Sequence, residues 1–492
     1  MTTKPRTTTP KPREAADNDN ELAPTAADST IFGPALDRLA AEVTGPVLVP
    51  GDEEYAAETA TWNLAVDYRP AVAVGAACVA DVQAAVRFAG ARELPVAVVA
   101  TGHGAVGPAD PGLLINLRRM DDIVVDQEQR TATVGPAVEM QQLIFATAEH
   151  GLAPLAGSSP NVGVVGYTLG GGLSPALGRA YGYAADHVRA AEIVTPDGQL
   201  RHIDQETEPD LFWAIRGGKG NFGVVTSLTL DLFPVTRLYG GGLFYDGEHA
   251  DAVLEEYRKL VADAPEILTA SVAFLRLPPL PFVPEPLQGR LTVHVRISYL
   301  MWAAEAEELI AGLRGAAPTL IDSVREMPFT DVASIHNDPV DPLPACESSA
   351  QLADFPREAA DALIAAAGPE ADTPALLVEI RQLGGALGRE PEEPNAVGNR
   401  DARFQLFAVA VGDPGLQQTL RPALQSVVDA LAPWGTGTTP INFLSSFDIT
   451  TEAVSKAYEP ATFERLARIK NDYDPKDLFR VNHNIPAAKS AA

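Results

Sequence analysis

Residues 98–107 read VVATGHGAVG, and this stretch decides the fold. A compact apolar run ends there in a loop that holds His103 between Gly102 and Gly104, with Gly107 close behind. Glycines allow the main chain to wrap around a polyanion and to point its N–H groups at a pyrophosphate. A neutral imidazole on such a loop is a nucleophile directed at the bound ligand. The other interpretation is a turn histidine without a task, and the loop alone does not separate the two.

The sequence around this loop alternates between short strand-like runs and helical runs, from about Pro50 to Leu232. Residues 79–93 place apolar side chains three and four positions apart, which predicts a helix just before the strand that ends at the loop. Further strands are predicted at 112–117, 122–126 and 131–136, followed by a helix near 138–150. The pattern is typical of strand–helix–strand units.

A second glycine-dense stretch covers residues 157–182, and a third glycine loop reads RGGKGNFG at 216–223. We expect no regular element in 157–182, because glycine leaves the backbone unconstrained and offers exposed N–H groups instead. No lysine follows the glycines of 157–182 as it does in a nucleoside triphosphate loop, and the GxGxxG dinucleotide pattern after a first strand is absent. Three glycine loops together indicate a long diphosphate ligand held by backbone from several sides.

The character of the sequence changes near Tyr239. From there to about Pro440 the chain mixes strands with alanine-rich helices and proline-rich loops, which predicts a second domain of the α+β kind. Strands are expected at 290–300, 375–383 and 404–411. The C-terminal part holds one amphipathic helix, at 461–473, and a tail that reads LFRVNHNIP.

The composition limits what the chain can bind. Its 37 basic and 65 acidic residues give a net charge of −28, which repels phosphate backbones, so we expect no nucleic-acid partner. Two distant cysteines, Cys78 and Cys346, support neither a disulfide framework nor a metal site. No apolar run reaches the ~18 residues that span a bilayer, and residues 1–30 resemble a disordered tail rather than a secretory signal. We therefore expect a cytoplasmic protein of open oligomeric state.

Five segments, in order, carry a resemblance to a known family: ATGHGAVG at 100–107, the run at 156–188, EIVTPDG at 192–198, LFWAIRGGKGNFGVVT at 211–226 and YDPKDLFRVNHNIP at 473–486. Together they resemble the berberine bridge enzyme-like branch of the vanillyl-alcohol oxidase and p-cresol methylhydroxylase (PCMH) superfamily of FAD flavoproteins. The resemblance covers almost the whole chain beyond the tail.

The resemblance implies an α+β fold with an interrupted FAD-binding domain. A two-subdomain FAD-binding domain of the PCMH type is expected at 31–237, with its PCMH-type core at about 66–236. A substrate domain of antiparallel sheet plus helices is inserted at 238–440 and caps the flavin. A berberine bridge-like segment at 441–492 then returns to the FAD domain.

The resemblance also implies the flavin contacts. His103 stands at the histidine that bonds to the 8α-methyl carbon of the flavin ring, although Val99, Ala100 and Thr101 replace the usual Arg-Ser-Gly before it. Ser159 stands where doubly linked members have a cysteine, and a hydroxyl is too poor a nucleophile to replace a thiolate, so one covalent link is expected. We expect FAD to contact Thr101, Gly102, His103, Gly104, Gly107, Ser158, Ser159, Val162, Gly163, Gly166, Val225, Asn482 and Asn484.

Two of these assignments have a simpler alternative. Asn482 and Asn484 match an N-x-N pair that reaches back to the flavin region, but they could also cap a final turn. Ser159 could be a turn serine. No metal ligand is expected.

The activity implied is FAD-dependent oxidation of a small organic substrate. A hydride leaves a C–H bond next to oxygen or nitrogen for flavin N5, and O2 takes the electrons to give H2O2. Val162 favours an oxidase, because oxygen-reactive members tend to carry a small valine there. The alternatives are a dehydrogenase with another acceptor, a non-oxidising cyclase or isomerase, and a flavin-binding protein without turnover.

The catalytic base is not identified by the sequence. Many family members place a tyrosine in Y-x-N-[FY], whereas residues 439–443 read TPINF and put Pro440 at the tyrosine. A further segment, which begins at Glu379, also resembles a motif of the family, and Gln382 stands there in place of a common histidine. Weak candidates for the base are His294, Tyr299, His336 and Tyr458. Each is more commonly a packed or solvated residue than a base.

Overall fold

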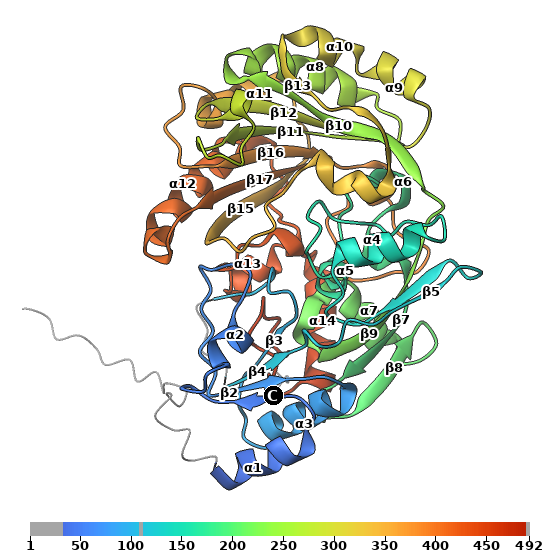
Figure 1. Cartoon of the computed structure of the whole chain (residues 1–492), viewed down its shortest axis with the longest axis vertical. Coiled ribbons are helices and arrows are strands. Elements are labelled where there is room, and N and C mark those ends of the chain that lie inside the picture. The colour runs from blue at the N-terminus through green and yellow to red at the C-terminus, as the bar shows by residue number, and fades with distance from the viewer. Residues whose placement is uncertain (1–32, 108–111, 489–492) are drawn as a thin grey trace, which may run out of the picture.

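The computed structural model describes residues 33–107 and 112–488, so the predicted tail at 1–30 lies outside the described residues. Within the described part the strands form three sheets (Figure 1). The first has the order β1-β2-β4-β3, from β1 (Val47–Leu48), β2 (Val72–Gly75), β3 (Val96–Val99) and β4 (Leu113–Asn116). Strands β2, β4 and β3 run parallel, as strand–helix–strand wiring requires. Its helices are α1 (Gly33–Glu42), α2 (Tyr55–Thr59) and α3 (Val79–Gly90).

The second sheet is antiparallel and has the order β5-β6-β9-β7-β8. Its strands are β5 (Ile123–Asp126), β6 (Thr131–Val134), β7 (Val188–Val194), β8 (Leu200–Asp204) and β9 (Val224–Asp231). The helices of this part are α4 (Met140–Ala148), α5 (Val164–Leu169), α6 (Gly178–Tyr181) and α7 (Pro209–Gly218). The first two sheets lie in the lower half of the molecule in Figure 1, and α6 lies higher, beside the cap sheet. We call the two sheets and these helices the flavin domain, after the domain that the resemblance implies.

The expectation of no regular element in 157–182 is wrong, because α5 and α6 both lie there. Helix α5 contains Gly166, which weakens a helix by about 1 kcal/mol relative to alanine. Val164, Val165 and Leu169 of the same helix are buried in the core, and this burial outweighs the propensity. The glycines of this stretch therefore shape the ends of short helices rather than exclude them.

The third sheet belongs to the cap and is antiparallel throughout, in the order β13-β10-β12-β11-β16-β17-β15, with β14 also paired to β10. Its strands are β10 (Arg237–Asp246), β11 (Leu268–Arg276), β12 (Leu291–Tyr299), β13 (Thr319–Asp322), β14 (Arg325–Pro328), β15 (Ala345–Leu352), β16 (Leu377–Gln382) and β17 (Phe404–Val411). Its helices are α8 (Ala250–Ala262), α9 (Ala303–Leu309), α10 (Ala311–Ala316), α11 (Arg357–Ala367) and α12 (Gln417–Ala430); Figure 1 shows the first four along the top of the sheet and α12 at its left side.

Side-chain alternation gives the cap sheet two different faces. On β12, Val293, Val295 and Ile297 pack in the core beneath the helices. His294 and Arg296 therefore lie on the opposite face, which is turned toward the flavin domain. We call it the polar face, because buried charged and polar side chains lie on it.

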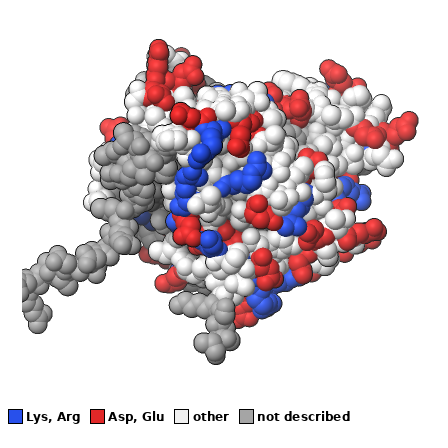
Figure 2. All heavy atoms as spheres, turned by 90° about the horizontal axis from the view of Figure 1, so that it is seen from below, with Lys and Arg blue, Asp and Glu red and all other residues white. Residues whose placement is uncertain are grey.

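The C-terminal segment returns from the cap to the flavin domain through α13 (Thr451–Ser455) and α14 (Pro460–Tyr473). Beyond α14, the carbonyl of Leu478 accepts a 2.9 Å hydrogen bond from Val96 of β3. Leu478 and Phe479 are buried in the core of the first sheet. The last part of the described chain thus completes the flavin domain. Figure 2 shows acidic and basic side chains interspersed over the lower face of the molecule.

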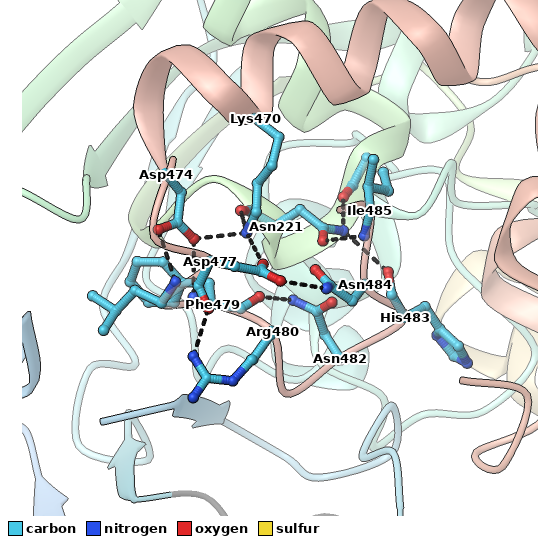
Figure 3. Close-up of polar contacts among 12 residues, drawn as sticks. Asn221, Lys470, Asp474, Asp477, Phe479, Arg480, Asn482, His483, Asn484 and Ile485 are labelled. Carbon is cyan, nitrogen blue, oxygen red and sulfur yellow. Dashed lines mark hydrogen bonds and ion pairs between the residues drawn. The ribbon is translucent and has the colours of Figure 1, made fainter. Parts of the chain in front are cut away.

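A buried lysine fixes this tail in place (Figure 3). Lys470, with 0% of its side chain exposed, places Nζ 2.6 Å from Oδ2 of Asp474 and 3.0 Å from Oδ1 of Asp477. The same amine donates to the carbonyl of Asn221 at 2.8 Å. The side chain of Asn221 in turn accepts a hydrogen bond from the N–H of Ile485 at 2.9 Å. Helix α14, the tail and the glycine loop at 216–223 are therefore one bonded unit.

Replacing this lysine should destabilise the fold strongly. The variant Lys470→Met leaves Asp474 buried without its cation, so we expect a loss of about 3–5 kcal/mol in the free energy of unfolding. Lys476→Met is the control, because Lys476 pairs with Glu93 at the surface, with side chains 70% and 72% exposed. That variant should change stability by less than about 1 kcal/mol. Urea titration of both proteins checks the difference, and equal stabilities would refute the role given to Lys470.

Candidate functional site

The loop after β3 presents His103 as a neutral, partly buried imidazole. Its Nδ1 lies 3.2 Å from Oγ1 of Thr101, and its ring stacks on Trp62 with centroids 4.6 Å apart. Nε2 is buried and finds no hydrogen-bond partner among the residues that the structure describes. Burial lowers the pKa of His103 to about 4, against an opposing contribution from Asn161. The ring is therefore uncharged at neutral pH and has one nitrogen available.

The glycines of this loop differ in what they do. Gly102 has a φ of 84°, and a Cβ there would lie 2.7 Å from the backbone nitrogen of Trp62, so a side chain is excluded. At Gly104 and Gly166 a Cβ would meet no atom of the described residues within 4 Å. Gly107 is buried and donates its N–H to the carbonyl of Ser446 at 2.8 Å. Open space therefore lies beside Gly104, next to the histidine.

The structure brings the second glycine segment against the histidine loop. The N–H of Gly163 donates to Oγ1 of Thr101 at 3.2 Å. Ser159 donates to Oδ1 of Asn161 at 2.8 Å, which is the turn contact that we considered as its alternative. Ser158 and Val162 are half-buried in the same segment. Val225 is buried in β9, where it pairs with Ile193 of β7.

Asn482 and Asn484 lie in the tail described above. Their amide groups donate at 2.8 Å to the carbonyl of Phe479 and to Oδ2 of Asp477, so both hold a turn (Figure 3). The carbonyl oxygen of each side chain is buried and has no hydrogen-bond partner among the described residues. Both residues therefore combine a structural contact with an acceptor that a ligand could use.

Between these asparagines, His483 contacts a lysine that the sequence analysis did not single out. Nε2 of His483 lies 3.0 Å from the carbonyl of Ser445, and Nδ1 lies 3.3 Å from Nζ of Lys219. Burial, aided by the Lys219 charge, lowers the pKa of His483 to about 3. Lys219 has φ 54° and ψ −147°, a backbone region that favours glycine and costs other residues about 1–3 kcal/mol.

Lys219 also faces a carboxylate from the cap. Burial lowers the pKa of Lys219 to about 8, and Glu347 of β15 opposes that change. Burial likewise raises the pKa of Glu347 to about 7, with Lys219 acting in the other direction. The two groups lie on opposite domains. The only signal for Lys219 in the sequence was a lysine inside an otherwise glycine-rich loop.

A loop of the cap closes over the histidine loop. The carbonyl of Val340 accepts a 3.0 Å bond from the indole of Trp62 and a 2.6 Å bond from the amide of Asn161. Asn63 exchanges two hydrogen bonds with the backbone of Ala345, at 3.0 and 3.1 Å. These contacts join the start of β15 and the loop before it to Trp62, Asn63 and Asn161 of the flavin domain.

The polar face carries a buried ionic cluster around Glu379. Arg296 and Arg381 lie 2.8 and 2.7 Å from its two carboxylate oxygens. Burial opposes ionisation, yet the two guanidinium groups hold the pKa of Glu379 well below its usual range. Nε2 of His336 lies 3.8 Å from the same carboxylate. Burial and the Arg296 charge lower the pKa values of His294 and His336, so both are neutral.

The four candidate bases separate into two groups. His294 and His336 belong to the cluster on the polar face. Tyr299 packs on the helix-covered side of the cap sheet, and its hydroxyl donates to Glu305 at 2.9 Å. Tyr458 is buried in the flavin domain, where its hydroxyl donates to the carbonyl of Gly217. The structure therefore places neither tyrosine on the polar face.

The segment with Pro440 lies beneath this cluster. Asn442 donates to the carbonyl of Tyr167 of α5 at 2.7 Å, which ties the segment to the glycine-rich helix. The ring of Phe443 lies 5.2 Å from that of Phe407 and 5.5 Å from the guanidinium of Arg381. The polar face of the cap thus meets the flavin domain at this point.

The described residues contain no group of three or more His, Cys, Asp or Glu side chains arranged to hold a metal ion. Among the helices in the same part of the chain, none has the length and apolar character to cross a membrane.

Two family models match the chain: an FAD binding domain at residues 70–204, and berberine and berberine-like at 441–486. The chain is 28% identical over 457 residues to (R)-6-hydroxynicotine oxidase of Paenarthrobacter nicotinovorans, covering 90% of this chain and 97% of that protein. It is 27% identical over 475 residues to the FAD-linked oxidoreductase YvdP of Bacillus subtilis, covering 91% and 99%.

Solved structures of flavin oxidases and related proteins also resemble this chain. The crystal structure of 6-hydroxy-D-nicotine oxidase from Arthrobacter nicotinovorans matches with a TM-score of 0.76 and 25% identity, over 90% of this chain and 98% of that one. The berberine bridge enzyme-like protein 1 of Physcomitrella patens shares the fold, with a TM-score of 0.77 and 20% identity over 90% and 97%.

The fold and the matched domains define a flavoprotein with a PCMH-type FAD-binding domain, so the predicted fold class is confirmed. More particularly, the chain carries a berberine-like segment and is similar to FAD-linked oxidoreductases, which supports an FAD-linked oxidoreductase and agrees with the resemblance stated above. The individual domain boundaries and flavin contacts stay predictions.

Acid should destabilise the protein through His483. Its pKa is about 3 in the folded state, whereas an unfolded histidine titrates near 6.5. Between these values the unfolded state binds more protons, so stability falls as pH drops below about 6.5, by up to ~1.4 kcal/mol per pH unit. In the His483→Gln variant the free energy of unfolding should fall less steeply as the pH drops. In the control His202→Gln, where the side chain replaced is 71% exposed, the pH dependence should match that of the wild type. Denaturant titrations at several pH values between about 4 and 7 check this prediction. The same pH dependence of stability in the wild type and in His483→Gln would contradict it.

Proposed function

We propose that the chain is an FAD-dependent oxidase whose cofactor is attached covalently through His103 alone. The observation that carries the proposal is the state of that histidine: buried, neutral, and with Nε2 unpartnered among the described residues. The surroundings fit FAD, because open space lies at Gly104 and Gly166 and unpartnered acceptor oxygens lie at Asn482 and Asn484.

The covalent link would replace one C–H bond of the flavin 8α-methyl group and the N–H bond of the imidazole by a C–N bond. The two electrons and two protons released reduce O2 to H2O2, so the change is balanced. A nucleophilic nitrogen must be unprotonated for this step, which the lowered pKa of His103 provides. Ser159 lies where a second link would need a thiolate, and its hydroxyl is engaged with Asn161. One link is therefore the expected number.

Bound FAD supplies a hydride acceptor and passes two electrons to O2. The chain supplies the enclosure, because Trp62 and Asn161 hold the cap loop at Val340 over the site and restrict water. Pro440 offers no proton acceptor where many relatives have a tyrosine. An amine donor suits this site, because its nitrogen lone pair assists hydride departure without a base. The names of the relatives, which include a hydroxynicotine oxidase, support this choice.

The covalent link is tested by acid precipitation. The wild-type protein should be yellow, and its flavin should stay in the acid pellet. His103→Ala should release its flavin into the supernatant, because the nucleophilic nitrogen is gone. His202→Ala removes an exposed histidine and should keep flavin in the pellet. Free flavin from the wild type would overturn the covalent assignment, and a colourless protein would overturn the proposed function as a whole.

Oxygen reactivity is tested at Val162. We expect air to reoxidise the dithionite-reduced protein with release of H2O2. A stopped-flow instrument measures this reaction through the return of flavin absorbance. Val162→Leu adds bulk to a half-buried position beside the histidine loop and should slow reoxidation by air. Reoxidation by a soluble quinone should change less. A wild-type protein that reacts with the quinone but not with air would be a dehydrogenase.

A further inference from the structure

The polar face of the cap brings five side chains into one row across neighbouring strands. Ser271 of β11 lies opposite Arg296 of β12 and Arg381 of β16. Arg381 lies opposite Gln405 of β17, and Gln405 lies opposite Gln351 of β15. Directly paired residues on one face of a sheet have Cβ atoms about 5 Å apart, so the row is continuous.

Several polar atoms of this row lack a partner among the described residues. They are Nε of Arg381, Oγ of Ser271, and both Nε2 and Oε1 of Gln405, which is 0% exposed. An unpaired buried polar group costs about 1–3 kcal/mol. Gln351, at the end of the row, is by contrast bonded to Asn399 and Thr438. The unpaired donors are therefore concentrated in the middle of the row, around Arg381.

The charges of the cluster are unequal. Arg296 and Arg381 share the single carboxylate of Glu379. His294 and His336 are neutral, for the reasons given above. The other carboxylate that acts on Arg381 and His336 is Asp338, which is half-exposed and so compensates incompletely. A buried excess of positive charge is costly unless an anion accompanies it.

A small cavity opens beside Ser271 and Arg381 of this row, whereas Gln405 lies next to Arg381 without lining the cavity. Ser271, Arg296 and Arg381 line it, together with His336 and Pro175, and Pro175 belongs to the flavin domain. The cavity therefore lies between the two domains. Its neighbour Arg381 also faces the ring of Phe443, next to the Pro440 position. An anionic group bound here would lie in the substrate region of the proposed oxidase.

We propose that Arg381, Ser271 and Gln405 bind a carboxylate group of the substrate, so that the oxidised molecule is a carboxylate-bearing amine or alcohol. This inference rests on the proposed function and specifies its substrate class. A carboxylate has two coplanar oxygens, which suit a guanidinium edge, an amide N–H and a hydroxyl. One such anion also balances the excess charge left by the two arginines.

The test is a titration of the flavin-loaded protein with benzoate and formate, and with their neutral counterparts benzamide and formamide, at constant ionic strength. Binding is followed by the change in flavin absorbance and by the rise in melting temperature. At least one carboxylate should bind about tenfold or more tightly than its amide, as charge-assisted hydrogen bonds require. Equal binding of acid and amide in both pairs would overturn the proposal.

A matched pair of variants locates the site. Gln405→Glu places a carboxylate beside Arg381, and it should abolish the preference for the acids while flavin content is retained. Gln425→Glu adds the same charge at an exposed position of the cap and should leave the preference intact. Unchanged preference in a folded Gln405→Glu protein overturns the assignment of these residues. If that variant does not fold, the comparison of acid and amide on the wild type still decides. Absence of flavin would instead count against the proposed function.

Discussion

The ammonium group of Lys470 is the contact on which the flavin domain depends most. It is fully buried, and it joins three segments: its own helix α14, the tail beyond it with Asp474 and Asp477, and a glycine loop some 250 residues earlier with Asn221. A buried cation cannot be left unpaired, so these three segments form together or not at all. Leu478 and Phe479 then enter the core of the first sheet, and the amides of Asn482 and Asn484 hold the turn that follows.

The cap depends on a different feature, the alternation of side chains between the two faces of its sheet. One face is continuously apolar and carries five helices within the described chain. The other face can then be charged, because the stability of the domain does not rest on it. This division allows residues such as Arg296, Glu379 and Arg381 to be held rigidly where they meet the flavin domain. The cost is a set of polar atoms without partners, and such atoms are typical of binding sites rather than of cores.

The sequence was informative where chemistry is local. The loop around His103, the parallel strands beside it and the berberine-like tail follow from short stretches. The fold class is confirmed, and the matched domains agree with the resemblance. Helices α5 and α6 were missed, because burial of Val164 and Leu169 outweighs the presence of glycine, and burial is a tertiary property.

The remaining site residues could not be found from local patterns. Gln405 and Ser271 become neighbours of Arg381 only through the register of three strands that are far apart in sequence. The roles of Trp62 and Glu347 likewise depend on residues of the opposite domain, Val340 for Trp62 and Lys219 for Glu347, and local sequence does not show these partners.

The order of segments along the chain has a consequence for synthesis. The described part of the flavin domain includes the early helices and strands from α1 onward, is interrupted by the cap, and is completed only by the strand contact at Leu478 and the hydrogen bond at Ile485. A ribosome makes the chain from the N-terminus, so the cap sheet can close while the domain that holds the cofactor is still incomplete. We therefore expect the cofactor to bind only after synthesis of the C-terminal segment. Until then the apolar surface of the first sheet stays uncovered in the nascent chain and is prone to aggregation.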